Sequence, residues 1–182
     1  MLKTKDILDE KNKLLRTISK EVTFPLSFED KEKINLMVEY LKNSQIDDLA
    51  EKYDLRPGMG MAAIQLGIAK RYITIVHEVE DGVFDEYVVV NPKITSYSNE
   101  MIAAEAGEGC LSVNRDIEGH IKRYARVTVE GYDLDGKKIK IRAREELAIA
   151  FQHEIDHLDG ILFYDRIDPK HKFYTDYELR LI

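Results

Sequence analysis

The spacing of apolar side chains predicts two helices in the first third of the chain. Residues 27–43 place apolar side chains at helical spacing, namely Ile34, Met37, Val38 and Leu41. Ser27 stands before them as a capping residue and is followed by an acidic first turn. A shorter helical stretch, residues 47–53, runs toward Pro57-Gly58, where regular structure ends. We therefore expect an N-terminal helix, a short second helix and then a loop.

Short runs of β-branched and aromatic residues predict a sheet in the middle of the chain. These runs have strand length and occupy residues 72–77, 87–90, 94–97, 127–132 and 139–141. Asp135-Gly136 lies between the last two runs and indicates a hairpin, because glycine tolerates the positive φ of a tight turn. The sheet is therefore expected to be at least partly antiparallel.

Residues 145–158 form the last predicted helix, which Asp159-Gly160 closes. Its apolar stripe consists of Leu147, Phe151, Ile155 and Leu158. On a helix that turns about 100° per residue, His153 and His157 lie away from this stripe. We expect an α+β fold with one domain over residues 1–182, in which a mainly antiparallel sheet packs around this central helix.

Composition limits the size of the fold and the kinds of partner. The chain has 182 residues, 44% of them hydrophobic, which suits one domain with a single core. The formal net charge of -7 argues against an open nucleic-acid surface, because phosphate binding needs clustered cations. Residues 1–15 carry charges throughout and contain no apolar run suited to a signal peptide or a membrane span. We expect a cytoplasmic protein that binds neither membranes nor specific nucleic-acid sequences.

The last predicted helix carries a candidate metal site. Residues 153–157 are His-Glu-Ile-Asp-His, and two imidazoles at i and i+4 project from one helix face. Buried histidines are costly to desolvate without partners, and a metal ion gives each ring a partner. Glu154 can then reach water at the metal. The alternative is a chance pattern, with both histidines hydrogen-bonded in the core, so a third ligand must decide.

Cys110 is the favoured third ligand. In metalloproteases with this motif, the third ligand is a later histidine or glutamate, but Phe163 occupies the histidine position and offers no lone pair. Glu178 is a possible carboxylate ligand near the end of the sequence, where a glutamate is more often solvated. Cys110 follows Gly109, whose backbone can approach a ligand closely. A thiolate with two imidazoles and an open position is a catalytic pattern, whereas the alternative for Cys110 is a small buried hydrophobe.

A glycine-rich segment, residues 58–65, is the second candidate site. Gly-Met-Gly-Met-Ala-Ala-Ile-Gln superficially resembles a nucleotide-binding loop, but charged residues precede it and no P-loop lysine follows. Because Gly58 and Gly60 lack side chains, the backbone can lie against an extended peptide and pair with it as an added strand. Gln65 would then offer an amide donor.

The three segments GMGMAAIQ, EGCLS and HEIDH, in this order, resemble the signature motifs of peptide deformylases. The resemblance extends over most of the chain, from about Leu14 to Leu158, and the helical insertion before Gly58 is similar to the longer, Gram-positive-type branch. Ile64 is a departure, because many relatives have proline there. This change could loosen the turn that aims Gln65.

The resemblance implies an enzyme that removes the N-formyl group from nascent polypeptides and releases formate. It implies that Cys110, His153 and His157 bind the metal and that Glu154 is the catalytic acid/base. It also implies that the Gln65 amide and the Leu111 N–H hold the oxyanion. The expected metal is ferrous iron, for which zinc, nickel or cobalt can substitute. The implied partners are N-formyl-methionyl nascent peptides and, transiently, the ribosome.

Substrate contacts are expected along two segments and on the last helix. The backbone positions are Gly58, Met59, Gly60 and Gly109. Ile149 and Ala150 lie one turn before His153, so they can wall a pocket for the methionine side chain. The alternative for both is ordinary core packing.

Two other functions fit parts of this pattern. A zinc endopeptidase is favoured by HExxH alone, but it is opposed by Phe163 and by the cysteine in EGCLS. A non-catalytic metal-binding or interaction domain would use the same ligands to hold the fold together. Glu154 and Gln65 speak against that function, because structural ligation needs neither of them.

Overall fold

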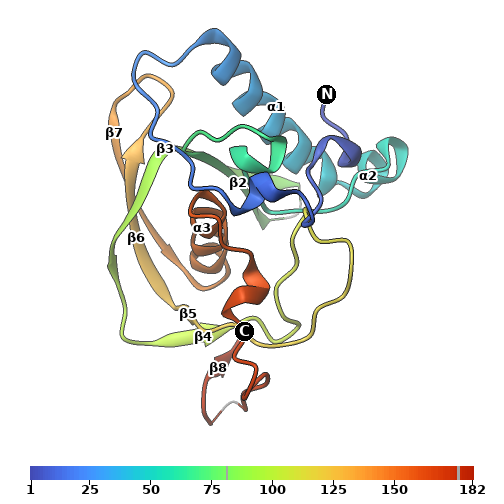
Figure 1. Cartoon of the computed structure of the whole chain (residues 1–182), viewed down its shortest axis with the longest axis vertical. Helices are drawn as coiled ribbons and strands as arrows, with labels where there is room; N and C mark the ends of the chain where they lie inside the picture. Colours follow the sequence, from blue (N-terminus) through green and yellow to red (C-terminus); the bar gives the residue numbers. More distant parts are fainter. Residues whose placement is uncertain (81, 176) are drawn as a thin grey trace.

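Two sheets and three α-helices make up the fold in the computed structural model, which describes residues 1–80, 82–175 and 177–182 (Figure 1). The larger sheet is antiparallel, in the order β1 Gly60–Ala62, β2 Tyr72–Glu80, β3 Val83–Tyr97, β6 Arg126–Tyr132 and β7 Lys138–Arg144. The smaller sheet has the order β5 Arg123–Tyr124, β4 Met101–Ala103 and β8 Arg180–Leu181. The predicted α+β class is confirmed.

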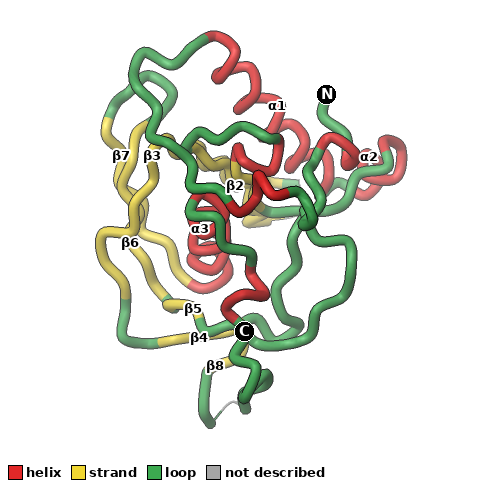
Figure 2. The backbone as a smooth tube through the Cα atoms, viewed as in Figure 1, coloured by secondary structure: helices red, strands yellow, loops and turns green. Residues whose placement is uncertain are grey.

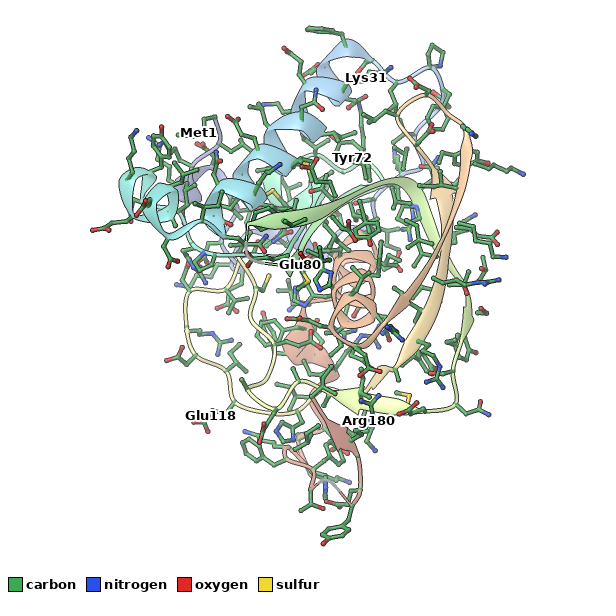
Figure 3. The ribbon with its side chains drawn as sticks, turned by 180° about the vertical axis from the view of Figure 1, so that it is seen from behind. Met1, Lys31, Tyr72, Glu80, Glu118 and Arg180 are labelled. Atoms are coloured by element: carbon green, nitrogen blue, oxygen red, sulfur yellow. The ribbon has the colours of Figure 1, made fainter. Side chains whose placement is uncertain are left out.

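The helices begin and end close to the predicted residues. They are α1 Phe28–Ser44, α2 Asp47–Tyr53 and α3 Glu145–Leu158, and short 3-10 turns include Ala63–Leu66 (Figure 2). The side chain of Ser27 accepts the Asp30 N–H at 3.1 Å, which caps α1. Figure 3 shows the side chains between α1 and the sheet, among them the fully buried Tyr72. Within the described residues, no helix has the length and apolar character needed to cross a membrane.

Helix α3 lies at the centre of the molecule, where the long strands curve around it (Figures 1 and 2). It contacts β1 and β2 as well as β5, β6 and β7. Phe151, Ile155 and Leu158 from the predicted stripe join the core. The polar residues between them are buried too, because every residue from 151 to 158 is enclosed. Each of these polar groups therefore needs a partner inside the protein.

The two strands predicted at residues 87–90 and 94–97 are one continuous strand, β3. Pro92 has no N–H for the ladder, and Asn91 takes a φ of 53°, so the register shifts between Val90 and Lys93. The strand continues because its two halves pair with different neighbours, β2 and β6. The predicted hairpin is present between β6 and β7, and Gly136 has a φ of 81° in its turn.

Candidate active site

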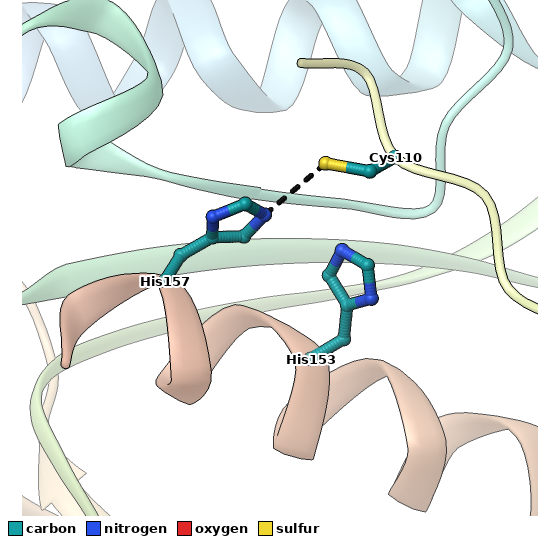
Figure 4. A group of neighbouring side chains, drawn as sticks. All are labelled: Cys110, His153 and His157. Atoms are coloured by element: carbon teal, nitrogen blue, oxygen red, sulfur yellow. Dashed lines mark hydrogen bonds between the residues drawn. The ribbon is translucent and has the colours of Figure 1, made fainter. Parts of the chain in front are cut away.

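Cys110, His153 and His157 meet beside α3, as Figure 4 shows. The candidate ligand atoms of the three residues lie within 4.8 Å of one another, and all three residues are buried. The Cys110 Sγ is 3.2 Å from Nε2 of His157, and the two imidazole rings are 5.1 Å apart between centroids. The helix supplies both histidines from one face, and the loop after Gly109 brings the thiol to them.

This donor set fits a divalent metal. One sulfur and two imidazole nitrogens suit zinc or ferrous iron, and three protein ligands leave a coordination position open. The Oε2 atom of Glu154 is buried next to these ligands and has no hydrogen-bond partner among the described residues. Such an atom is costly unless something polar meets it. Glu178 takes no part, because its carboxylate binds Thr175 and lies 3.1 Å from His171.

Glu108 orients the first histidine. Its Oε2 is 2.9 Å from Nδ1 of His153, which leaves Nε2 of that ring for a metal. Burial alone would lower the pKa of His153, but hydrogen bonds with Cys110 and Glu108 raise it well above the ordinary value. By contrast, burial and the neighbouring charge on His153 lower the pKa of His157. Sequence reasoning missed Glu108, although it stands two residues before the thiol.

A buried guanidinium holds the carboxylates beside the site. Arg123 is 2% exposed; it donates to Glu108 at 2.7 and 2.9 Å and to Asp156 at 2.6 Å. Arg166 also donates to Asp156. Burial alone would raise the pKa of Glu108, but hydrogen bonds from Arg123 and His153 lower this pKa to about 2. The network was not predicted, because Arg123 lies in a two-residue strand without a pattern of its own.

Burial raises the pKa of Glu154 to about 7. A carboxyl group that titrates near neutrality can both accept and return a proton. Its position depends on Gly60, because a Cβ built there would lie 2.4 Å from Oε1 of Glu154. A Cβ at Gly58 would likewise lie 2.8 Å from Cδ1 of Leu111. Both glycines therefore make room for the protein's own side chains, a role that the sequence interpretation, which linked them to an approaching peptide, did not predict.

The Gln65 amide is held in place beside the thiol. Its Oε1 accepts the Ala62 N–H at 2.9 Å, and its Nε2 donates to Ser112 at 3.1 Å. The same nitrogen lies 3.7 Å from the Cys110 Sγ. Ile64, fully buried, occupies a formed 3-10 turn, so the turn that aims Gln65 forms without proline at this position.

Arg56 clamps the loop that carries the thiol. Its guanidinium donates to the carbonyls of Cys110 at 3.3 Å, Leu111 at 3.2 Å and Val113 at 2.9 Å, and also to the Asn114 side chain. Three carbonyls held by one rigid fork fix the path of the backbone. Sequence reasoning placed position 56 in a loop and assigned it no role.

A cavity of about 630 Å³ opens at the ligands. We call the part lined by Gln65, Cys110, Leu111, His153 and Glu154 its inner end. The part at the start of α3 and beside the smaller sheet we call its outer end; it is lined by Ala104, Glu145, Glu146, Ile149, Ala150 and Ile182. Gly58, Met59, Gly60 and Gly109 also border it. Eleven of the twelve residues expected at the site thus line the cavity; the twelfth, His157, does not line it but lies 3.2 Å from the Cys110 Sγ.

Comparison with known proteins identifies the family. Residues 4–173 match the model described as polypeptide deformylase. Peptide deformylase 2 of Geobacillus stearothermophilus is 47% identical, over 95% of this chain and 94% of that protein. The peptide deformylase of Listeria monocytogenes is 47% identical, over 96% and 95%.

Comparison with solved structures supports the same family. A plant peptide deformylase superposes with a TM-score of 0.75 at 28% identity, covering 90% of this chain and 80% of that one. The peptide deformylase of Thermotoga maritima gives a TM-score of 0.71 at 32% identity, covering 90% and 97%. The chain therefore belongs to the peptide deformylases, the metal-dependent hydrolases that remove the formyl group from nascent polypeptides.

Proposed function

We propose that this chain hydrolyses the formyl group of N-terminal formyl-methionine at the site formed by Cys110, His153 and His157, releasing formate. One observation carries the proposal: a thiol and two imidazoles converge within 4.8 Å at the inner end of a cavity. Buried Glu154 and Gln65 face the same end. A purely structural metal site would need neither of these two residues.

The proposed metal ligands are Cys110 Sγ, His157 Nε2 and the His153 nitrogen that Glu108 leaves free. When bound, a divalent ion would act as a Lewis acid and lower the pKa of a water at the open position. The residues around it are already positioned. The Arg123 network holds Glu108, and Arg56 holds the cysteine loop.

Glu154 is the proposed acid/base. Its unpartnered Oε2 would accept the proton of the attacking water and return it to the leaving amine. The pKa of about 7 that burial gives this carboxyl group supports both steps. No other carboxyl among the described cavity-lining residues combines this burial with a free oxygen, because Glu108 is engaged by Arg123 and His153.

Gln65 and Leu111 are the proposed oxyanion donors. The Gln65 Nε2 lies next to the thiol, and the Leu111 N–H belongs to the segment that Arg56 clamps. Donors fixed in this way stabilise the negative oxygen formed when water attacks the formyl carbon. By comparison with other oxyanion holes, each is worth roughly 3 kcal/mol in the transition state.

The peptide would bind along the free edge of β1. This strand is the first in its sheet, and Gly58, Met59 and Gly60 border the cavity. An extended substrate can therefore pair with its backbone as an added strand. Gly109 would approach the peptide from the opposite loop, while Ile149 and Ala150 would contact the methionine side chain.

We propose ferrous iron as the working metal, with zinc, nickel or cobalt able to substitute. The Cys/His/His set alone does not separate them, and zinc generally binds such sites more tightly than ferrous iron. Iron bound to Cys110 should lose activity in air, because both the ion and the sulfur can be oxidised. Metal analysis after anaerobic purification tests this, and zinc alone in that preparation would contradict it. The proposed setting is the cytoplasm, with transient contact to the ribosome.

The decisive assay compares two substrates. Formate release from a formyl-methionyl peptide should be fast, whereas the same peptide with a blocked, unformylated N-terminus should stay intact. Cleavage at internal peptide bonds would support the endopeptidase alternative instead. Metal bound at one ion per chain without either activity would support a structural site.

A further inference from the structure

A short strand from the last residues of the sequence forms part of the active-site cavity. Strand β8 pairs in parallel with β4, and its Leu181 lies beside Ala103 (Figure 1). The Ile182 N–H donates to the Ala103 carbonyl at 3.0 Å, and the Glu105 N–H donates to the Ile182 carbonyl at 2.8 Å. These two bonds continue the register and place Ile182 beside Ala104. Ile182 and Ala104 both line the outer end of the cavity.

Strand register determines which residues of β8 face the central helix. Residues side by side in neighbouring strands point to the same face of a sheet, and successive residues point to opposite faces. On β4, Ile102 and Ala104 pack with Ile149 of α3. Arg180 and Ile182, their neighbours on β8, therefore point toward α3 as well.

Ile182 extends the apolar wall that begins at Ile149. Ala104 packs against the cluster that contains Ile149, and Ile182 continues this surface on the next strand, about 5 Å further on. Ile182 is 38% exposed, so part of its side chain is free to contact a ligand. Ile149 is proposed above to contact the methionine side chain. Because the next side chain of an extended peptide points the opposite way, this wall serves the methionine and not the residue after it.

Arg180 fixes β8 to the start of α3. Its guanidinium donates to both carboxylate oxygens of Glu145, at 2.7 and 2.9 Å, and to Glu100 at 2.9 Å. Figure 3 shows Arg180 at the smaller sheet. Glu145 is the first residue of α3 and has a φ of 54°, which residues with a side chain rarely adopt. Such a conformation persists only when its surroundings hold it, and a bidentate guanidinium is a rigid partner.

We propose that Ile182 is a specificity-determining residue that closes the methionine pocket at the outer end of the cavity, and that Arg180 positions it. This inference rests on the proposed deformylation. A slender methionine side chain lies along the wall, whereas Ile182 excludes the broader ring of a phenylalanine. Strand β8 lies beyond residues 4–173, which match the family model, and sequence analysis assigned Ile182 no role.

The test uses two peptides that differ only in the first residue, one formyl-methionyl and one formyl-phenylalanyl. Formate release gives kcat and KM for each. Ile182→Ala should raise KM for the methionyl peptide about threefold, because a contact is lost, and lower KM for the phenylalanyl peptide about threefold, because space is gained. The preference for methionine should thus fall about tenfold. The kcat for the methionyl peptide should stay within about twofold, because Ile182 does not contact the reacting atoms.

Leu181→Ala is the matched control. It removes a side chain of similar size from the same strand, but on the opposite face. The preference for methionine should therefore stay within about twofold of the wild-type value. Melting temperatures are measured for all variants. If Ile182→Ala melts early, Ile182→Val replaces it and should lower the preference about twofold, in the same direction.

Arg180→Ala tests the positioning role. It should lower the preference for methionine about threefold, less than Ile182→Ala, because the backbone bonds of β8 to β4 remain and because Arg180 is itself half-exposed. Arg180→Lys keeps the charge and should recover part of the preference. A loss of melting temperature without a change in preference would remove Arg180 from this role.

The outcomes separate this inference from the proposed function. Formate release from the methionyl peptide with an unchanged preference in both Ile182 variants would overturn the role of Ile182 and leave the deformylation standing. An equal change in Leu181→Ala would also overturn it, because a general loosening of β8 would then explain the result. Wild-type protein that releases formate from neither peptide would contradict the proposed function itself, and this inference with it.

Discussion

The two ends of the active-site cavity are built differently, although α3 contributes to both. At the inner end, Arg123 is 2% exposed and is bonded to two carboxylates, and one of these orients His153. At the outer end, the Glu146 side chain is 70% exposed, and its carboxylate lies 4.0 Å from Nε2 of His77. The helix begins at the surface and ends in the core, so each end has a different environment.

This difference suggests that the inner end carries out the reaction and that the outer end contacts the rest of the substrate. Groups that must meet a developing charge act best when they are fixed in advance in a site from which water is excluded. At the inner end the groups are fixed in this way, because buried ion pairs hold Glu108 and thereby His153, and hydrogen bonds hold Gln65 and the cysteine loop. Side chains at the outer end can adapt to whichever residues follow the methionine. Substitutions at the inner end should therefore change metal binding or kcat, and those at the outer end should change KM slightly.

The largest effect is expected for Cys110→Ala. Loss of the thiolate removes one of three ligands, so metal content should fall toward zero and activity at least about a thousandfold. Metal analysis and formate release measure both quantities. Wild-type protein stripped by a chelator should recover activity when ferrous iron is added, whereas the variant should not. Full metal content in the variant would exclude Cys110 as a ligand.

The second-largest loss of activity is expected for Glu154→Gln. The amide keeps the size of the side chain but cannot accept a proton, so kcat should fall on the order of 10²–10⁴-fold. Metal content should be unchanged. Steady-state kinetics with a formyl-methionyl peptide measure the split between kcat and KM. A variant with normal kcat would show that another group acts as the base.

Glu108→Gln tests whether the hydrogen bond between Glu108 and His153 supports metal binding. The amide can still accept a hydrogen bond from His153, but it leaves buried Arg123 with less compensating charge. Metal affinity should fall about 10- to 100-fold, as for other residues that orient a metal-binding histidine. Competition with a fluorescent chelator measures it. Unchanged affinity together with an unchanged melting temperature would remove Glu108 from this role.

A pair of glycine variants compares the two walls of the cavity. Gly60→Ala places a Cβ 2.4 Å from the Glu154 carboxylate, so kcat should fall about tenfold as that group is displaced. Gly109→Ala is the matched control, since its Cβ meets no described atom within 4 Å. It should keep kcat and raise KM, because the methyl group enters the substrate space. The reverse pattern would mean that the missing side chain at Gly60 makes room for the peptide and not for the Glu154 carboxylate.

Glu146→Gln should have the smallest effect. The side chain is largely exposed, and substitutions at such positions usually change the stability of a protein very little. With an uncharged formyl-methionyl peptide, kcat and KM should each change by less than about threefold. A large fall in kcat would show that the outer end is as constrained as the inner end, and the comparison would fail.

Local patterns in the sequence were sufficient for the elements and motifs that depend on neighbours along the chain. The cap at Ser27 and the apolar spacing after it predicted α1, and the glycine at position 136 predicted the β6–β7 hairpin. The i, i+4 histidines predicted a shared face because helix geometry alone places them there. Strands β1, β4, β5 and β8 were not predicted, since two or three residues are too few to show a period.

Only the tertiary structure decided which distant groups meet. Arg123 is far from Asp156 in the sequence, and nothing near position 123 indicates that its guanidinium is buried between two carboxylates. The contact of Gly60 with Glu154 and the clamp formed by Arg56 depend in the same way on the packing of separate segments. Residue types and local spacing determine which chemistry is available, because they act over a few residues. Long-range packing determines where each group points, because that depends on which surfaces become buried together.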